Sequence, residues 1–145
     1  MKLPVVPGKI TQLWADRQMV EDCFHDLRSQ DLPGFTLFLV VDKGPAKDIV
    51  HPVWTHLKGD PEDLLVLLHL GVPDYSGWSN VLPFLRQRLY QKRIAMLALF
   101  EESKEGVGPL SKAWAFSAHI RGELSLSPRG WHARLTKDKR VLPCP

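Results

Sequence analysis

Polar and hydrophobic residues alternate along one stretch near the C-terminal end of the chain, residues 113–126. Apolar side chains occupy its even positions and polar ones most of its odd positions, a period of two that is typical of a strand with one buried face. Residues 127–130 (SPRG) have the composition of a turn, with proline second and glycine fourth. The alternation resumes with the opposite phase over residues 131–136. The pattern therefore predicts a β-hairpin.

A four-residue loop fixes which side chains lie opposite each other in this hairpin. It sets three pairs on the apolar face and two on the polar face. A cross-strand ion pair is one of the contacts that stabilise such a sheet. The predicted pairs are Leu126 with Trp131, Leu124 with Ala133, Gly122 with Leu135, Ser125 with His132, and Glu123 with Arg134, the last of them an ion pair.

Three further stretches have the pattern or the boundaries of helices: residues 13–30, 61–70 and 80–92. In the first, apolar residues recur every three or four positions, which marks one face of a helix. The second begins at Asp60-Pro61, a helix cap with proline at the first helical position, and a glycine closes it. It is apolar on every side, so we expect it to be deeply packed or to lie in a subunit interface.

Two near-continuous apolar runs, residues 35–42 and 94–100, are rich in residues that favour strands. Runs of this kind predict strands that are buried on both faces or nearly so. Because the strands gather toward the C-terminal end of the chain, we expect an α+β fold with a largely antiparallel sheet. Its strands would lie near 35–42, 94–100, 113–126 and 131–136, and the three helices would cover one face of it.

The chain of 145 residues, with 44% hydrophobic and 24% charged residues, has the size and composition of a single soluble globular domain. We expect one domain over 1–145, with an extended N-terminal arm at 1–10, where two prolines disfavour helix, and a short tail at 141–145. No apolar run is long enough to span a bilayer, and the first residues lack the composition of a secretory signal. Two cysteines make a poor disulfide framework, so the cytoplasm or another reducing intracellular compartment is the expected location.

Basic residues give the chain a formal net charge of +3, which permits an anionic partner without requiring one. They gather in one patch on the predicted helix at 80–92 and its exit, in a second patch after the hairpin, and on the hairpin's polar face. Such patches could bind nucleic-acid phosphates or an anionic membrane, although an ordinary charged helix face is the competing interpretation. An RNA-reading sheet would also need exposed aromatic residues, and the polar hairpin face has none. The candidate anion-binding residues are Arg86, Arg88, Lys92, Arg93, Arg121, Arg134, Lys137, Lys139 and Arg140.

Catalytic and metal-binding motifs are absent from the sequence, which contains no CxxC, HExxH, GxSxG, GxGxxG or P-loop pattern. We therefore expect neither a metal nor a cofactor, and a non-enzymatic protein is the leading hypothesis. The alternative is a small enzyme that uses His119, Glu123 and His132, on the hairpin's polar face, for acid/base chemistry on an anionic substrate. A solvated sheet surface is the competing interpretation of that face. Asp42 and His69 are weaker candidates, because a turn-forming aspartate and a packed core histidine explain them more simply.

Five tryptophans are more than a chain of this size usually carries. Most should lie in the core, although tryptophan is also a common anchor of interfaces. We expect Trp54 and Trp78, which fall in irregular segments, to be such anchors in a homo-oligomer. The leading hypothesis is thus a self-associating binding protein with an anionic partner, and the composition is compatible with a small viral or accessory protein.

Overall fold

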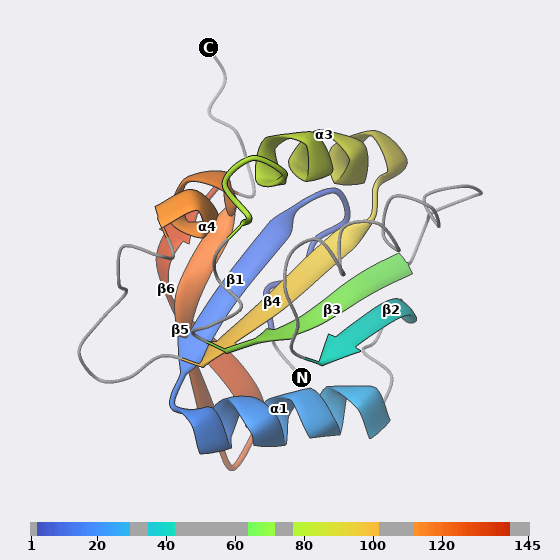
Figure 1. Cartoon of the computed structure of the whole chain (residues 1–145). Helices are drawn as coiled ribbons and strands as arrows, with labels where there is room; N and C mark the ends of the chain where they lie inside the picture. The colour runs from blue at the N-terminus through green and yellow to red at the C-terminus, as the bar shows by residue number, and fades with distance from the viewer. Residues whose placement is uncertain (1–2, 30–34, 43–63, 72–76, 102–111, 140–145) are drawn as a thin grey trace.

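A single six-stranded sheet forms the centre of the computed structural model (Figure 1), which describes residues 3–29, 35–42, 64–71, 77–101 and 112–139. The strands are β1 (Ile10–Ala15), β2 (Thr36–Asp42), β3 (Leu64–Leu70), β4 (Ala95–Glu101), β5 (Ile120–Ser127) and β6 (Gly130–Asp138). The helices of the described segments are α1 (Arg17–Ser29), α3 (Leu82–Lys92) and α4 (Lys112–Ser117). The order across the sheet is β2-β3-β4-β1-β5-β6.

Most neighbouring strands run parallel, which corrects the expected antiparallel sheet. β1 pairs in parallel with β4 and β5, and β3 pairs in parallel with β2 and β4. Among the strands that the structure describes, only β5 and β6 form an antiparallel pair. The physical reason is visible in the apolar runs themselves, because strands of a parallel sheet are buried on both faces and lose the alternation of polar and apolar residues.

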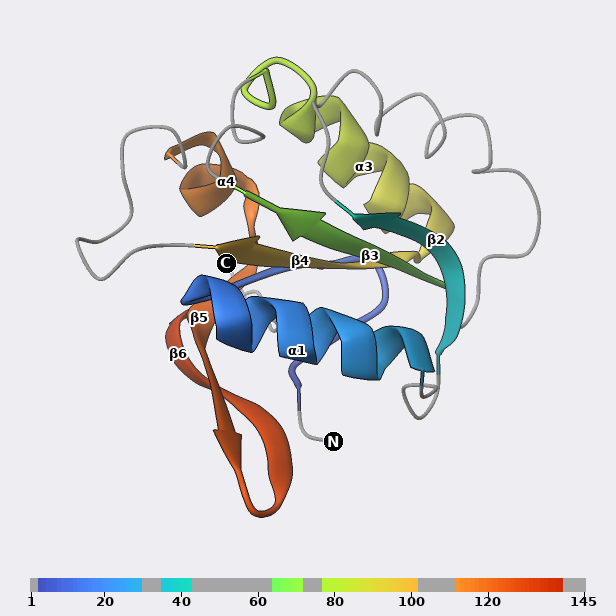
Figure 2. The same ribbon diagram turned by 60° about the horizontal axis from the view of Figure 1, so that its bottom comes forward.

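Helices cover both faces of the sheet, whereas the sequence predicts helices on one face only. α1 lies on one face, and α3 and α4 lie on the other (Figure 2). Alternate residues of β3 serve the two sides: Leu67 packs into the core beneath α1, and Leu68 packs into the core beneath α3 and α4. The central strands are therefore enclosed on both sides.

Two of the predicted helices are wrong in whole or in part. The described part of the predicted helix at 61–70 is strand β3, because an unbroken apolar run fits a central parallel strand as well as a buried helix. The predicted helix at 13–30 starts too early, since its first residues belong to β1. α1 itself begins after Asp16, whose Oδ1 accepts a hydrogen bond from the Met19 N–H over 2.9 Å.

The hairpin is confirmed in its register but not in its length. The five predicted cross-strand pairs are all present, including the ion pair, in which Arg134 donates to Glu123 over 2.9 Å. The predicted strand at 113–126 is too long, because its first part forms α4 and β5 begins only at Ile120. Phe116 consequently leaves the predicted buried face and is 81% exposed.

The other predicted elements agree with the structure in their positions. α3 lies within the predicted helix at 80–92, and β4 matches the predicted buried strand at 94–100. β2 matches the predicted strand at 35–42 in its bounds but not in its burial, because it lies at the edge of the sheet and none of its described side chains is fully buried. In the N-terminal arm, Leu3 and Val5 pack against the core beneath α1. The tail at 141–145 lies outside the described residues. Within the segments described, no helix is long and apolar enough to cross a membrane.

Because both faces of β3 are enclosed, truncating either of two consecutive residues should be costly. We predict that Leu67→Ala and Leu68→Ala each lower the free energy of unfolding by about 2–5 kcal/mol, measured by urea denaturation. Leu126→Ala, at an exposed position of β5, is the control and should change it by at most about 0.5 kcal/mol. A negligible loss for one of the two β3 variants would show that one face of the strand is not covered.

Candidate functional site

Positively charged side chains converge near the amino ends of β1 and β5, beneath α3 and α4. His119 lies at their centre, immediately before β5, and is only 5% exposed. Arg86 of α3 reaches this histidine, with 3.0 Å between the arginine Nε and His119 Nε2. The basic side chains around His119, which we call the cation cluster, are Lys9, Arg86, Arg121, Lys137 and Lys139.

Hydrogen bonds at the ends of three strands hold His119 in place. The His119 N–H donates to the Ile10 carbonyl, and the Lys139 N–H donates to the His119 carbonyl. The side chain adds a third contact, because the Ile10 N–H donates to His119 Nδ1 over 3.0 Å. The imidazole is therefore fixed between the start of β1 and the end of β6.

Burial and, secondarily, nearby positive charges favour the neutral form of His119. The pKa of His119 falls to about 4, first because the ring is buried and then because of nearby positive charges, of which Arg86 is the strongest. The pKa of Lys137 is also lowered, first by burial and then by other members of the cluster. Among the described residues, all the charges that shift these two pKa values are positive.

Neutral groups hold two of the cations. Lys137 Nζ donates to two carbonyl oxygens of α4, over 3.2 and 3.3 Å. Arg121 Nε donates to Gln12 Oε1 over 2.7 Å, and its guanidinium carbon lies 5.0 Å from the centre of the Trp14 ring. Carbonyl groups and an aromatic ring orient a cation without removing its charge. These contacts orient both side chains within the cluster.

The proton of the neutral His119 ring belongs on Nε2. A neutral imidazole donates at one nitrogen and accepts at the other, so it cannot accept hydrogen bonds at both. The buried N–H of Ile10 needs an acceptor, which makes Nδ1 the accepting atom. Arg86 Nε–H points at Nε2 over 3.0 Å, and a ring that carries its proton on Nε2 cannot accept that hydrogen bond as well. The guanidinium of Arg86, which has further N–H donors, is thus the group at this point that an anion could engage.

A pocket of about 320 Å³ opens at this point. Residues of α3, the N-terminal arm and the turn before β5 form its wall. A pocket with convergent polar donors is the usual form of a small-ligand site. The lining residues are Lys9, Pro83, Arg86, Gln87, Tyr90 and His119.

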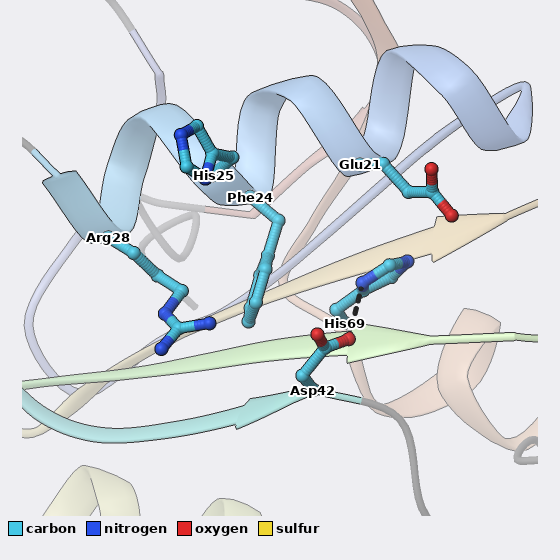
Figure 3. Close-up of a pocket in the computed structure, with 6 residues that line it drawn as sticks. All are labelled: Glu21, Phe24, His25, Arg28, Asp42 and His69. Atoms are coloured by element: carbon cyan, nitrogen blue, oxygen red, sulfur yellow. Dashed lines mark ion pairs between the residues drawn. The ribbon is translucent and has the colours of Figure 1, made fainter.

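A second polar cluster lies at the opposite end of the sheet, at the carboxyl ends of β2, β3 and β4 (Figure 3). His69 of β3 is 2% exposed, with its Nδ1 2.9 Å from Asp42 Oδ1 and its Nε2 3.6 Å from Glu101 Oε1. Glu101 Oε1 also lies 3.6 Å from Arg17 Nε at the start of α1. We call these four residues the carboxyl-end cluster.

The topology explains this position. α1 leaves β1 over one face of the sheet, whereas the next helix that the structure describes after the neighbouring strand β4 is α4, on the other face. In open parallel sheets, ligands bind outside the carboxyl ends of the strands at such a divergence. A cleft of about 280 Å³ lies beside the cluster, and its lining residues are Glu21, Phe24, His25, Arg28, Asp42 and His69.

The carboxyl-end cluster can hold or transfer a proton. A protonated His69 could donate to both carboxylates, whereas a neutral ring donates to only one. Within the described residues, neither ring nitrogen makes an aligned hydrogen bond despite these short distances. Asp42, whose side chain is half exposed, faces the cleft and could accept a proton from a ligand. No group of three or more His, Cys, Asp and Glu side chains in the described segments is placed to hold a metal ion.

The structure distributes the candidate anion-binding residues over several places. Arg86, Arg121, Lys137 and Lys139 meet in the cation cluster, although they come from different patches of the sequence. Arg134 lies elsewhere and pairs with Glu123. The remaining candidates are Arg88, Lys92 and Arg93, on or directly after α3, and Arg140, which lies outside the described residues.

The three residues of the alternative catalytic hypothesis are not brought together. Glu123 forms its ion pair with Arg134, and His132 Nε2 lies 2.7 Å from Ser125 Oγ. Both pairs lie farther along the hairpin than His119, which contacts Arg86 instead. The hairpin therefore does not assemble one acid/base site from these side chains.

Of the two proposed interface anchors, the one that the structure describes gives no exposed aromatic surface. Trp78 is fully buried, and its ring centre lies 4.7 Å from that of Trp114 in the core beneath α3 and α4. Trp54 lies outside the described residues. Trp78 thus serves the core of its own chain.

Sequence reasoning missed the carboxyl-end cluster as a unit and the contribution of Lys9 to the cation cluster. A signal for the former is present in the sequence, because Asp42, His69 and Glu101 each stand at or near the end of an apolar run. The carboxyl ends of parallel strands meet at one edge of a sheet, so polar residues there become neighbours. The signal is usable only once the strands are known to be parallel.

No protein-family model matches this chain, and no curated protein is significantly similar to it in sequence. No activity, partner or cofactor is therefore transferred from a relative. The residues that could carry a function are those that the fold brings together at the two ends of the sheet.

The lowered pKa of His119 predicts how its contribution to stability varies with pH. Between its ordinary pKa of 6.5 and about 4, the unfolded chain binds a proton at His119 that the folded chain does not. Acidification across this window should therefore destabilise the wild type more than His119→Gln, as measured by urea denaturation at several pH values. Identical pH dependence of the two proteins would show that the ring is not held neutral.

Proposed function

We propose that the chain is a non-enzymatic binding protein whose cation cluster receives an anionic group of its partner. One observation carries the proposal: Arg86, whose Nε lies 3.0 Å from Nε2 of the buried His119, meets Lys9 at the wall of a pocket of about 320 Å³. A phosphate or carboxylate oxygen can accept from the guanidinium of Arg86, and hydrogen bonds to an ionised acceptor are strong. Nucleic acids and anionic membrane surfaces both carry such groups.

The charge of the cluster supports the same proposal. The pKa of both His119 and Lys137 is lowered, first by burial and then by like charges nearby, which disfavour the charged forms. A bound anion interacts favourably with several cations at once, and partial burial reduces screening by salt. The site should therefore prefer a multiply charged anion to a chloride ion.

Self-association is a further part of the hypothesis. Two features of the sequence that favour it have another explanation in the fold. Trp78 and the described part of segment 61–70 are buried within the chain itself. Neither therefore offers an apolar surface to a second copy. Self-association stays a prediction from composition.

We place this function in a reducing intracellular compartment. Cys23 of α1 is a free thiol, buried in the core beneath that helix. A buried cysteine behaves as a small apolar side chain, and free thiols are typical of reducing compartments. Cys23 thus supports the proposed location.

The thiol of Cys23 should be unreactive while the chain is folded. Burial, and secondarily the charge of Asp26, raise the pKa of this thiol to about 12, so almost no thiolate forms at about pH 8. In Cys144→Ser, where Cys23 is the one remaining cysteine, we predict that Ellman's reagent reacts only after denaturant is added. Fast reaction of the folded variant would contradict the buried position.

A second candidate function is acid/base chemistry in the cleft beside the carboxyl-end cluster. The observation in its favour is the contact of buried His69 with Asp42 at 2.9 Å, at the edge of the sheet where parallel folds bind ligands. Small molecules that raise the melting temperature of the wild type and of Arg86→Gln, but not of Asp42→Asn, would place a ligand in this cleft. Small molecules that raise the melting temperature of Asp42→Asn as much as that of the wild type would count against this candidate function.

Pyrophosphate tests the cation cluster directly. We predict that it raises the melting temperature of the wild type, and that Arg86→Gln weakens its binding about tenfold or more, because one charged hydrogen-bond partner is lost. Arg88→Gln removes the same charge from the same helix outside the cluster and is the matched control, expected to respond as the wild type does. Equal effects of the two substitutions would show that net charge, and not the site, attracts the anion.

A further inference from the structure

We infer that the anionic partner is a single-stranded nucleic acid, whose phosphates enter the cation cluster and whose bases stack on aromatic side chains of α3 and α4. The inference rests on the proposed function, since it presumes that the cluster binds an anion. Three observations extend it to this class of partner: exposed aromatic rings, their position beside the cations, and the concave form of the site.

Exposed aromatic rings are concentrated on the two helices that frame the cluster. Among the described residues, the large hydrophobic side chains that are exposed include Phe84, Tyr90 and Phe116, at 62%, 64% and 81%. The first two lie on α3 and the third on α4. Three exposed rings on the two helices that frame the cluster offer aromatic surface to a binding partner.

Two of the residues that bear these rings contact members of the cation cluster, Tyr90 through its ring and Phe116 through its backbone carbonyl. Tyr90 lines the pocket with Arg86 and His119, and Lys9 Nζ lies 5.9 Å from the centre of its ring. On α4, the carbonyl of Phe116 accepts a hydrogen bond from Lys137 Nζ over 3.3 Å. Alternation of cations with aromatic rings is the arrangement that binds single-stranded nucleic acids, in which phosphates meet the charges and bases stack on the rings.

The aromatic rings favour a single strand over a duplex. Bases in a duplex are stacked on one another and offer no free face, whereas those of a single strand can be unstacked onto a protein ring. The sequence hypothesis counted the lack of aromatics on the hairpin's polar face against RNA binding. In the structure the exposed rings lie on helices instead, so that objection applies only to a sheet-based mode of binding.

The shape of the site favours nucleic acid over a membrane surface. Attraction to an anionic bilayer acts mainly on exposed lysine and arginine side chains at a broad surface. Here the central donor is Arg86, which is half buried beside the buried His119, and both residues line a pocket. A phosphate on a flexible single strand can enter such a pocket more readily than a lipid headgroup fixed in a bilayer.

Fluorescence anisotropy with a labelled oligothymidylate of about 20 nucleotides tests the inference. We expect binding that weakens steeply between roughly 50 and 200 mM salt, and affinity that falls about tenfold in Tyr90→Ala and in Phe116→Ala through loss of stacking. Arg86→Gln should also reduce the steepness of the salt dependence. Leu126→Ala, another exposed apolar position, is the control and should bind as the wild type does. All of the truncated side chains are exposed, and circular dichroism confirms that each variant is folded.

The outcomes separate this inference from the proposed function. If Tyr90→Ala and Phe116→Ala bind oligothymidylate as the wild type does, or if duplex DNA of the same length binds as tightly, the inference fails. It also fails if phosphatidylserine vesicles bind and the oligonucleotide does not. In any of these cases, the anion site still stands if pyrophosphate binds Tyr90→Ala as it binds the wild type and does not bind Arg86→Gln. If pyrophosphate does not bind the wild type at all, the proposed function itself fails.

Discussion

Burial of a parallel sheet on both faces is the constraint on which the rest of this structure depends. The strands satisfy one another's backbone hydrogen bonds, and their side chains require cover on two sides, so α1 takes one face and α3 and α4 take the other. A charged side chain in the middle of such a sheet would be buried without water or a partner, at a high cost in free energy. Polar chemistry is therefore confined to the strand ends, where the cation cluster and the carboxyl-end cluster both lie.

His119 connects this architecture to the proposed function. Its ring nitrogen satisfies a buried backbone N–H of β1, and that structural bond decides which nitrogen carries the proton. Arg86 Nε lies 3.0 Å from the other ring nitrogen, so a residue required by the fold positions a guanidinium at the wall of the pocket. The exposed ring of Tyr90 extends the surface beyond the phosphate.

Local pattern was sufficient for the elements that depend on neighbours in sequence. It predicted the hairpin register, α3, β2 and β4, because alternation and helical spacing directly reflect which side chains are buried. It failed for residues 64–70, since an unbroken apolar run has no period and only pairing with β2 and β4 makes it a strand. The sequence did not predict the cation cluster for a similar reason: in the sequence, Arg86 lies 33 positions from His119, and Ile10 lies 109 positions from it. Single residues of the cluster could be named from the sequence, but predicting that they lie together requires the parallel order of the strands.

The central claim is that an anion binds to Arg86 beside the neutral ring of His119, and nitrogen-15 NMR of the histidine side chains tests it most directly. Long-range proton–nitrogen spectra at neutral pH should show a protonated Nε2 and an unprotonated Nδ1 for His119, assigned by comparison with His119→Gln. The Nε2 resonance should then shift as pyrophosphate is added. A ring protonated on Nδ1, or a resonance that pyrophosphate does not move, would contradict the account.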